Sequence, residues 1–178
     1  MSSPLISRAD LEAAFLALAN RLARRGVVGT VFVFAGGAAM MMAFDARAAT
    51  RDVDAVFQPH GAILDEVWAV ADQLGLPRYW LNEQGSSYLS SNYQEAATPV
   101  WQHPSLRIMA ISGKQLLAMK ALASRRYADL DDIRFLTAHL GITELDAVEA
   151  VVAEVFPGET LSDRARLVIE DVLAQPPQ

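Results

Sequence analysis

The stretch that decides the fold is residues 27–57, VVGTVFVFAGGAAMMMAFDARAATRDVDAVF. Its first part, residues 27–34, is an almost continuous apolar run rich in β-branched side chains, which predicts a strand buried on both faces. Gly36 and Gly37 end this run, because adjacent glycines favour a turn. A short helix is expected from Ala38 to Arg47. The order strand, glycine turn, helix therefore begins the fold.

A second strand is predicted from Arg51 to Phe57. Asp52 and Asp54 are two residues apart, so their side chains project from the same face of that strand. Like charges this close repel unless a cation neutralises them, and oxygen-only ligation by carboxylates suits Mg²⁺ or Mn²⁺. A glycine turn at the start of a helix also lets backbone N–H groups approach an anion. Together these features predict a nucleotide-transfer site.

Composition excludes several classes of protein. The chain has 178 residues, of which 52% are hydrophobic and 20% charged, so it can bury a sizeable core and is not disordered. It contains no cysteine, which excludes disulfides, thiolate zinc sites and cysteine nucleophiles. The uncharged run from Gly26 to Phe44 is long enough to cross a bilayer, but its glycines divide it into a strand and a helix. We therefore expect a cytoplasmic protein without a membrane partner.

The remaining pattern predicts a mixed α/β fold of the α+β class. We expect a small mixed sheet flanked by helices over residues 1–113, followed by a helical lobe over 114–178 that packs on it within one structural domain. Apolar periodicity and capping signals predict helices at 7–25, 62–74, 114–126, 129–140, 143–155 and 161–173. Further strands are expected at 79–81, 87–89 and 106–111.

Charge is unevenly distributed. The formal net charge is −6, which by itself speaks against a nucleic-acid partner. Residues 140–178, however, hold two basic against eight acidic residues and account for the whole excess. The stretches that carry the motifs are locally basic, so a nucleic-acid partner stays open.

Lys120 lies in a segment otherwise made of leucine, alanine and methionine, residues 116–123. Its ammonium group must either snorkel outward to water or meet an anion. A bound triphosphate would serve as that anion. For Asp129 and Asp132, a simple helix start is the competing explanation, since acidic residues are common there.

Two linked motifs resemble a known group of enzymes. Val33-Phe34-Ala35-Gly36-Gly37, followed by Arg51-Asp52-Val53-Asp54-Ala55-Val56, resembles the Gly-Gly and Asp-x-Asp signature of the polymerase-β-type nucleotidyltransferase superfamily. Within it, the chain is most similar to the AbiEii-like and MenT-like toxin branch. Thr50 matches the Ser or Thr that precedes Asp-x-Asp there, and residues 117–133 match a later pattern of Lys, Arg and Asp.

The resemblance implies an enzyme that transfers a nucleoside monophosphate from a nucleoside triphosphate to an acceptor. The acceptor would be the 3′ end of tRNA, and the protein would be a toxin with a cognate antitoxin as partner. Asp52 and Asp54 would hold the metal, and Asp132 would activate or orient the acceptor. Residues implied in nucleotide binding are Gly36, Gly37, Thr50, Lys120, Arg125 and Arg126. Thr50 is also where an antitoxin would modify the enzyme.

Other interpretations stay open from the sequence. The superfamily's usual third metal-binding carboxylate is missing from residues 106–111, which leaves room for an inactive binding module with this fold. The acceptor could also be a protein. A dinucleotide-binding Rossmann unit is a further alternative, because Asp54 follows Gly36 at a suitable distance, although the G-x-G-x-x-G pattern is absent.

Overall fold

The computed structural model describes residues 5–123 and 129–175, and the chain divides into two compact units. Unit 1 comprises the chain up to Ser87 together with Ala96–Ile111. Unit 2 comprises Tyr88–Glu95 and the chain from Ser112 onward. Unit 1 carries the sheet and unit 2 is helical, so the predicted mixed α+β class is confirmed.

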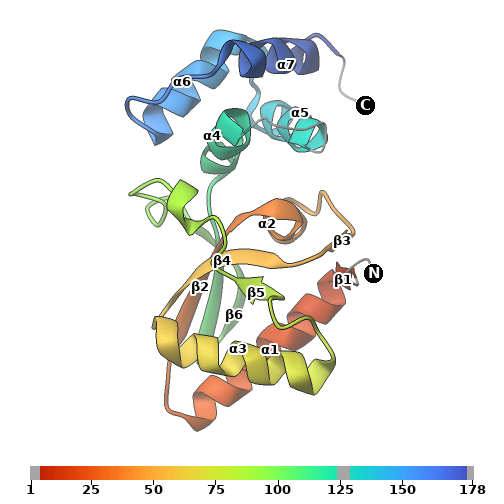
Figure 1. Ribbon diagram of the computed structural model, residues 1–178, viewed down its shortest axis with the longest axis vertical. Coiled ribbons are helices and arrows are strands. Elements are labelled where there is room, and N and C mark those ends of the chain that lie inside the picture. Colours follow the sequence, from red (N-terminus) through yellow and green to blue (C-terminus); the bar gives the residue numbers. More distant parts are fainter. Residues whose placement is uncertain (1–4, 124–128, 176–178) are drawn as a thin grey trace. The chain divides into compact units, whose positions relative to one another are not determined.

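Unit 1 is built on a five-stranded mixed sheet, coloured from orange to green in Figure 1. The strand order is β5-β4-β2-β7-β6. β2 is antiparallel to β4 and parallel to β7, β4 is parallel to β5, and β6 is antiparallel to β7. The strands are β2 (Gly29–Ala35), β4 (Val53–Gln58), β5 (Leu81–Asn82), β6 (Thr98–His103) and β7 (Leu106–Ala110), with a separate pair of β1 (Ile6–Ser7) and β3 (Ala49–Thr50).

Three helices complete unit 1, and each lies where a helix is predicted, although the second begins at Gly36 and ends at Phe44 instead of running from Ala38 to Arg47. They are α1 (Arg8–Arg24), α2 (Gly36–Phe44) and α3 (His60–Leu74). α1 begins with a reciprocal capping box between Ser7 and Asp10, which satisfies two backbone donors at its start. α3 ends at Gly75, which adopts the left-handed conformation typical of a glycine after a helix.

The core of unit 1 is aromatic and lies under α1. The Phe15 ring lies 6.0 Å from that of Trp80 and 5.9 Å from that of Trp101, so α1 spans from the β5 edge of the sheet to β6. Trp80 is fully buried, and its indole N–H donates to the carbonyl of Val67 at 3.1 Å. A Cβ on Gly29 would lie within 2.8 Å of Ile63 of α3, which identifies the face of β2 that α3 covers. One face of the sheet is thus closed by α1 and α3.

Three sequence expectations need correction. The strand expected at 87–89 is wrong, because residues Ser86–Tyr88 form a 3₁₀ turn. β6 was not predicted, since Pro99 interrupts its pattern and its residues are only partly buried. The Rossmann alternative is wrong, because such a unit needs parallel strands around its helix, whereas β2 and β4 are antiparallel.

The uncharged run from Gly26 to Phe44 is divided between β2 and α2. In the part of the chain that the structure describes, no helix has both the length and the apolar character needed to span a bilayer.

Unit 2 contains four helices in its described residues: α4 (Gly113–Ala123), α5 (Leu130–Leu140), α6 (Leu145–Val155) and α7 (Asp163–Leu173). α4 packs against both α5 and α6, and α7 packs against α5. The segment 88–95 joins this unit through Gln115, whose side-chain amide donates to the Ser90 hydroxyl and to the Asn92 carbonyl, each at 3.3 Å.

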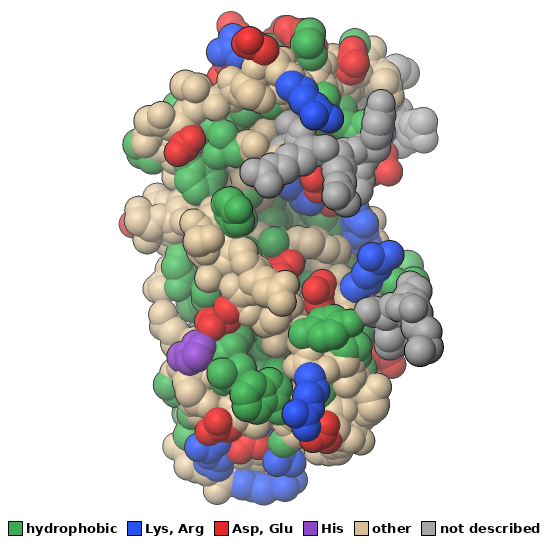
Figure 2. All heavy atoms as spheres, in the orientation of Figure 1, with side chains coloured by type: hydrophobic (Ala, Val, Ile, Leu, Met, Phe, Trp, Pro, Cys, Tyr) green, Lys and Arg blue, Asp and Glu red, His purple; other side chains and the backbone are tan. Residues whose placement is uncertain are grey.

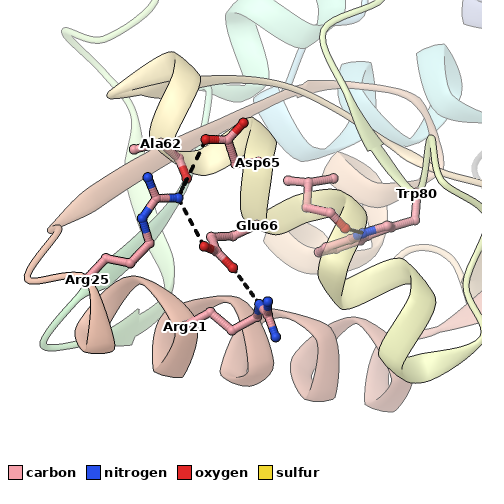
Figure 3. Close-up of polar contacts among 7 residues, drawn as sticks. Arg21, Arg25, Ala62, Asp65, Glu66 and Trp80 are labelled. Carbon is pink, nitrogen blue, oxygen red and sulfur yellow. Dashed lines mark hydrogen bonds and ion pairs between the residues drawn. The ribbon is translucent and has the colours of Figure 1, made fainter.

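An ionic clamp joins α1 to α3 (Figure 3). Glu66, buried on α3, accepts from Arg21 Nε at 2.5 Å and from Arg25 Nη1 at 3.0 Å. Burial raises the pKa of Glu66, but the hydrogen bonds and charges of both arginines outweigh it, so the pKa lies below its ordinary value. Figure 2 shows acidic and basic side chains interspersed at the lower end of unit 1, where α1 ends.

We expect Glu66→Ala to lower the free energy of unfolding by about 2 kcal/mol, because it removes two charge-assisted hydrogen bonds at a buried carboxylate. Asp65→Ala is the matched control, since Asp65 is exposed and lies 3.6 Å from Arg25. That variant should change stability by less than about 0.5 kcal/mol. Urea denaturation followed by circular dichroism measures both, and equal losses would contradict the clamp.

Candidate active site

A row of residues across three strands of unit 1 forms the centre of the site. A register shift between Val33 and Ala35 of β2 brings Ala35 opposite Asp54 of β4. On the other side of β4, Asp54 is in register with Asn82 of β5. The glycine turn begins directly after Ala35, so strand pairing places the turn, a carboxylate and an amide side by side.

The two glycines of this turn serve different purposes. Gly36 has a φ of 69°, which favours glycine, and a Cβ on it would lie 3.3 Å from Asp54 Oδ2. A Cβ on Gly37 would lie 3.0 Å from Thr50 Oγ1 and 3.4 Å from Cδ of Arg47. Both glycines therefore let the start of α2 approach Asp54 and Thr50 closely, and side chains there would fill the space.

Both aspartates are half-buried, and burial raises the pKa of each. Burial, followed by repulsion from Asp52, raises the pKa of Asp54 to about 6. Burial also raises the pKa of Asp52, against the opposing charge of Arg51 and a side-chain hydrogen bond from Asn82. The predicted alternation is confirmed, since Val53, Ala55 and Phe57 are buried whereas Asp54 lies on the opposite face of β4.

Thr50 is buried at the end of β3, and its hydroxyl donates to the backbone carbonyl of Asp52 at 2.8 Å. This bond closes the short turn between β3 and β4. Thr50 therefore positions the backbone that carries Asp52. The structure brings together five of the residues named from the sequence: Gly36, Gly37, Thr50, Asp52 and Asp54.

Lys120 and Asp132 come together within unit 2. The Lys120 side chain is only 11% exposed, and its ammonium group lies 2.7 Å from Asp132 Oδ2 and 3.0 Å from Asp129 Oδ1. The snorkelling alternative is wrong, because the charge is paired inside the unit rather than extended to water. Asp132 is itself buried, with 6% of its side chain exposed.

The helix-start explanation holds for the position of Asp129, which is the N-cap residue of α5, but does not account for its side chain. Asp129 precedes α5, but its side chain makes no capping hydrogen bond and pairs with Lys120 instead. Arg125 and Arg126 lie outside the described residues.

Sequence reasoning missed two residues of this region, one beside the carboxylates and one beside the glycine turn. Asn82 lies on a two-residue strand with no pattern of its own, and only its pairing with β4 shows its place beside Asp54. Arg47 was expected to end a helix, whereas α2 ends at Phe44 and the Arg47 side chain lies against Gly37. Neither position carries a local signal in the sequence.

The donor set of unit 1 fits a divalent cation. Within residues 5–123 and 129–175, no group of three or more His, Asp or Glu side chains gathers as a metal site. Two carboxylates are nonetheless a usual protein contribution to Mg²⁺ binding when substrate phosphates supply further oxygens. Repulsion from Asp52 contributes to the raised pKa of Asp54, so a cation beside the pair would relieve that repulsion.

A glycine turn beside Asp54 of β4, with Asp52 directly before that strand, is the arrangement that the sequence predicts for a nucleotide-transfer site. A family model described as "Nucleotidyltransferase of unknown function (DUF6036)" matches residues 12–167. Because this match covers most of the chain, the protein belongs to that nucleotidyltransferase family, and the predicted superfamily is confirmed. The comparison with curated proteins found no match, and neither did the comparison with solved structures.

We expect Asp54→Asn to stabilise the metal-free protein at pH 7.5. A raised pKa means that the folded state binds the proton of Asp54 more tightly than the unfolded chain does. The stability that this proton provides is therefore fully present below pH 3.8 and is lost as the pH rises through about 6. Asparagine stays neutral at every pH, so Asp54→Asn never places a charge at this half-buried position. The gain at pH 7.5 should be about 1 kcal/mol, discounted because Asp54 is partly exposed.

Urea denaturation in EDTA at pH 4 and pH 7.5 measures this difference. The difference in free energy of unfolding between Asp54→Asn and the unsubstituted protein should be smaller at pH 4 than at pH 7.5. Asp72→Asn, which alters an exposed ion pair on α3, serves as the control. A gap of equal size at both pH values would show that Asp54 is not the destabilising charge.

Proposed function

We propose that this protein is a metal-dependent nucleotidyltransferase that transfers a nucleoside monophosphate from a nucleoside triphosphate to the 3′ end of tRNA. The observation that carries the proposal is the row formed by the glycine turn, Asp54 and its neighbour Asp52. Membership of the nucleotidyltransferase family supports the reaction class. In the reaction, the acceptor hydroxyl oxygen bonds to the α-phosphorus, and the bond from that phosphorus to the β-phosphate oxygen breaks, releasing pyrophosphate.

Asp52 and Asp54 would hold Mg²⁺ or Mn²⁺. Such an ion supplies positive charge against the phosphate oxygens and favours ionisation of the attacking hydroxyl. Thr50 would keep the backbone of Asp52 in place through its 2.8 Å hydrogen bond. The site thus offers fixed negative charge where a cation must sit.

The glycine turn would bind the triphosphate. Gly36 and Gly37 open α2, whose first N–H groups have no partner within the helix and carry partial positive charge. Arg47 lies beside Gly37 and adds a cation to that end. An anion can approach this backbone because neither glycine has a side chain in the way.

Lys120 and Asp132 are the residues of unit 2 to which we assign a role. Lys120 would bind the triphosphate, and Asp132 would orient the acceptor hydroxyl or accept its proton. Their present pairing holds both side chains in one geometry. To bind phosphate, Lys120 would exchange one anionic partner for another.

The toxin role is a further part of the proposal. Nucleotides added to the 3′ end of tRNA would prevent aminoacylation, and growth would stop unless an antitoxin restrained the enzyme. The order of motifs shared with the AbiEii-like and MenT-like branch supports this proposal. A protein acceptor is the alternative that the same transfer assay detects.

We expect Asp54→Asn to abolish transfer, with a loss of at least about 100-fold, because it removes a metal-holding charge. The full-length protein is incubated with Mg²⁺ and each of the four α-labelled nucleoside triphosphates, with total tRNA or with periodate-oxidised tRNA. Label should join only tRNA with an intact 3′ end. Label on protein alone would show that the acceptor is a protein and not tRNA. No transfer to either would show that the protein is an inactive binding module.

We expect Arg125→Glu and Arg126→Glu to weaken tRNA binding and flatten its dependence on salt. Removing one arginine–phosphate interaction should reduce the slope of log K against log salt by about 0.7 to 0.9. Filter binding between about 50 and 200 mM salt, the range in which such interactions weaken most clearly, measures the slope. Arg164→Glu, on α7 and away from the matched motifs, is the control, and an unchanged slope in both arginine variants would remove them from the RNA-binding surface.

A further inference from the structure

Asn82 is held in one orientation by its own turn. Its side-chain amide donates to the carbonyl of Tyr79 at 3.1 Å, and its side-chain oxygen accepts from the backbone N–H of Gln84 at 2.8 Å. The pairing of β5 with β4 sets its backbone opposite Asp54. An asparagine fixed at both ends of its amide presents its remaining N–H in a defined direction.

That remaining donor meets the carboxylate of Asp52. Asp52 precedes β4, so no strand pairing fixes its backbone, and the bond from Thr50 to its carbonyl does not fix its side chain. The hydrogen bond from Asn82 supplies that missing constraint. Asn82 is therefore next to both aspartates: it is in register with Asp54 and hydrogen-bonded to Asp52.

We infer that Asn82 is the positioning residue of this site, which holds the Asp52 carboxylate in the orientation that binds the divalent cation. The inference rests on the proposed function, since it deepens the role of the same carboxylates. Groups that orient metal ligands typically contribute about 10- to 100-fold in metal affinity.

The amide suits this role because it is neutral. A carboxylate at the same place would add a third negative charge beside two groups that already repel each other. A hydrogen-bond donor instead orients the Asp52 carboxylate without adding charge to the site. Asn82 thereby positions a metal-binding carboxylate without being a ligand itself.

Two substitutions test this inference in the full chain. Asn82→Ala removes the donor, and Asn82→Asp keeps the shape and the acceptor for Gln84 but cannot donate to Asp52. Glu83→Ala is the matched control, because Glu83 lies on the same turn and pairs with His60 at 2.6 Å. Circular dichroism verifies that each variant is folded.

Binding of Mn²⁺ without nucleotide, measured by electron paramagnetic resonance, is the first readout. We expect Asn82→Ala to weaken binding about 10-fold, Asn82→Asp to bind no more tightly than the unsubstituted protein, and Glu83→Ala to leave binding unchanged. Tighter binding by Asn82→Asp would make position 82 a ligand and overturn the inference. Equal losses in Asn82→Ala and Glu83→Ala would reduce Asn82 to a structural residue of the turn.

Transfer kinetics are the second readout and separate the two proposals. Asn82→Ala should lower kcat by about 10-fold and leave KM for tRNA unchanged, because the residue acts through Asp52 and not on the acceptor. If the unsubstituted protein transfers nothing, the proposed function fails, while Mn²⁺ binding still decides the role of Asn82.

Discussion

The register of β4 against β2 is the constraint on which the site depends. Side chains alternate along a strand, so a slip of one residue would turn Asp54 toward the face that α3 covers. A carboxylate buried there without a partner would cost several kcal/mol. Val53, Ala55 and Phe57, buried on that face, hold the register by their own packing. Hydrophobic burial on one side of the strand thus fixes the charges on the other.

The two charged clusters differ in how their charge is balanced. In unit 1, burial and repulsion from Asp52 both disfavour the charged form of Asp54. In unit 2, Lys120 already has two carboxylate partners. A cation added beside the aspartate pair would lower the electrostatic energy of that site. A phosphate that binds Lys120 must instead replace an existing carboxylate partner, so its net gain in free energy is small. This difference makes the aspartate pair the stronger basis for a functional assignment.

The sequence predicted the features that local patterns encode. Alternation in residues 51–57 defined β4 and the shared face of its aspartates, and Gly36-Gly37 marked the turn into α2. β5 and β3 have two residues each and carry no periodicity, so their contributions, Asn82 and the backbone contact of Thr50, depend on tertiary pairing. The partner of Lys120 was likewise hidden, because Asp129 has the sequence of a helix cap and is used for an ion pair.

The acidic net charge of the chain does not oppose phosphate binding at the glycine turn. At physiological salt, charges separated by more than about 8 Å along an exposed surface are largely screened, so nearby groups dominate. Arg51 is exposed beside Asp52, and its charge opposes the rise in the pKa of that carboxyl. Arg47 follows α2 in the chain, but its side chain lies beside Gly37 at the start of that helix. This local balance of carboxylates and arginines, not the overall charge of −6, therefore governs which charged groups can approach the turn.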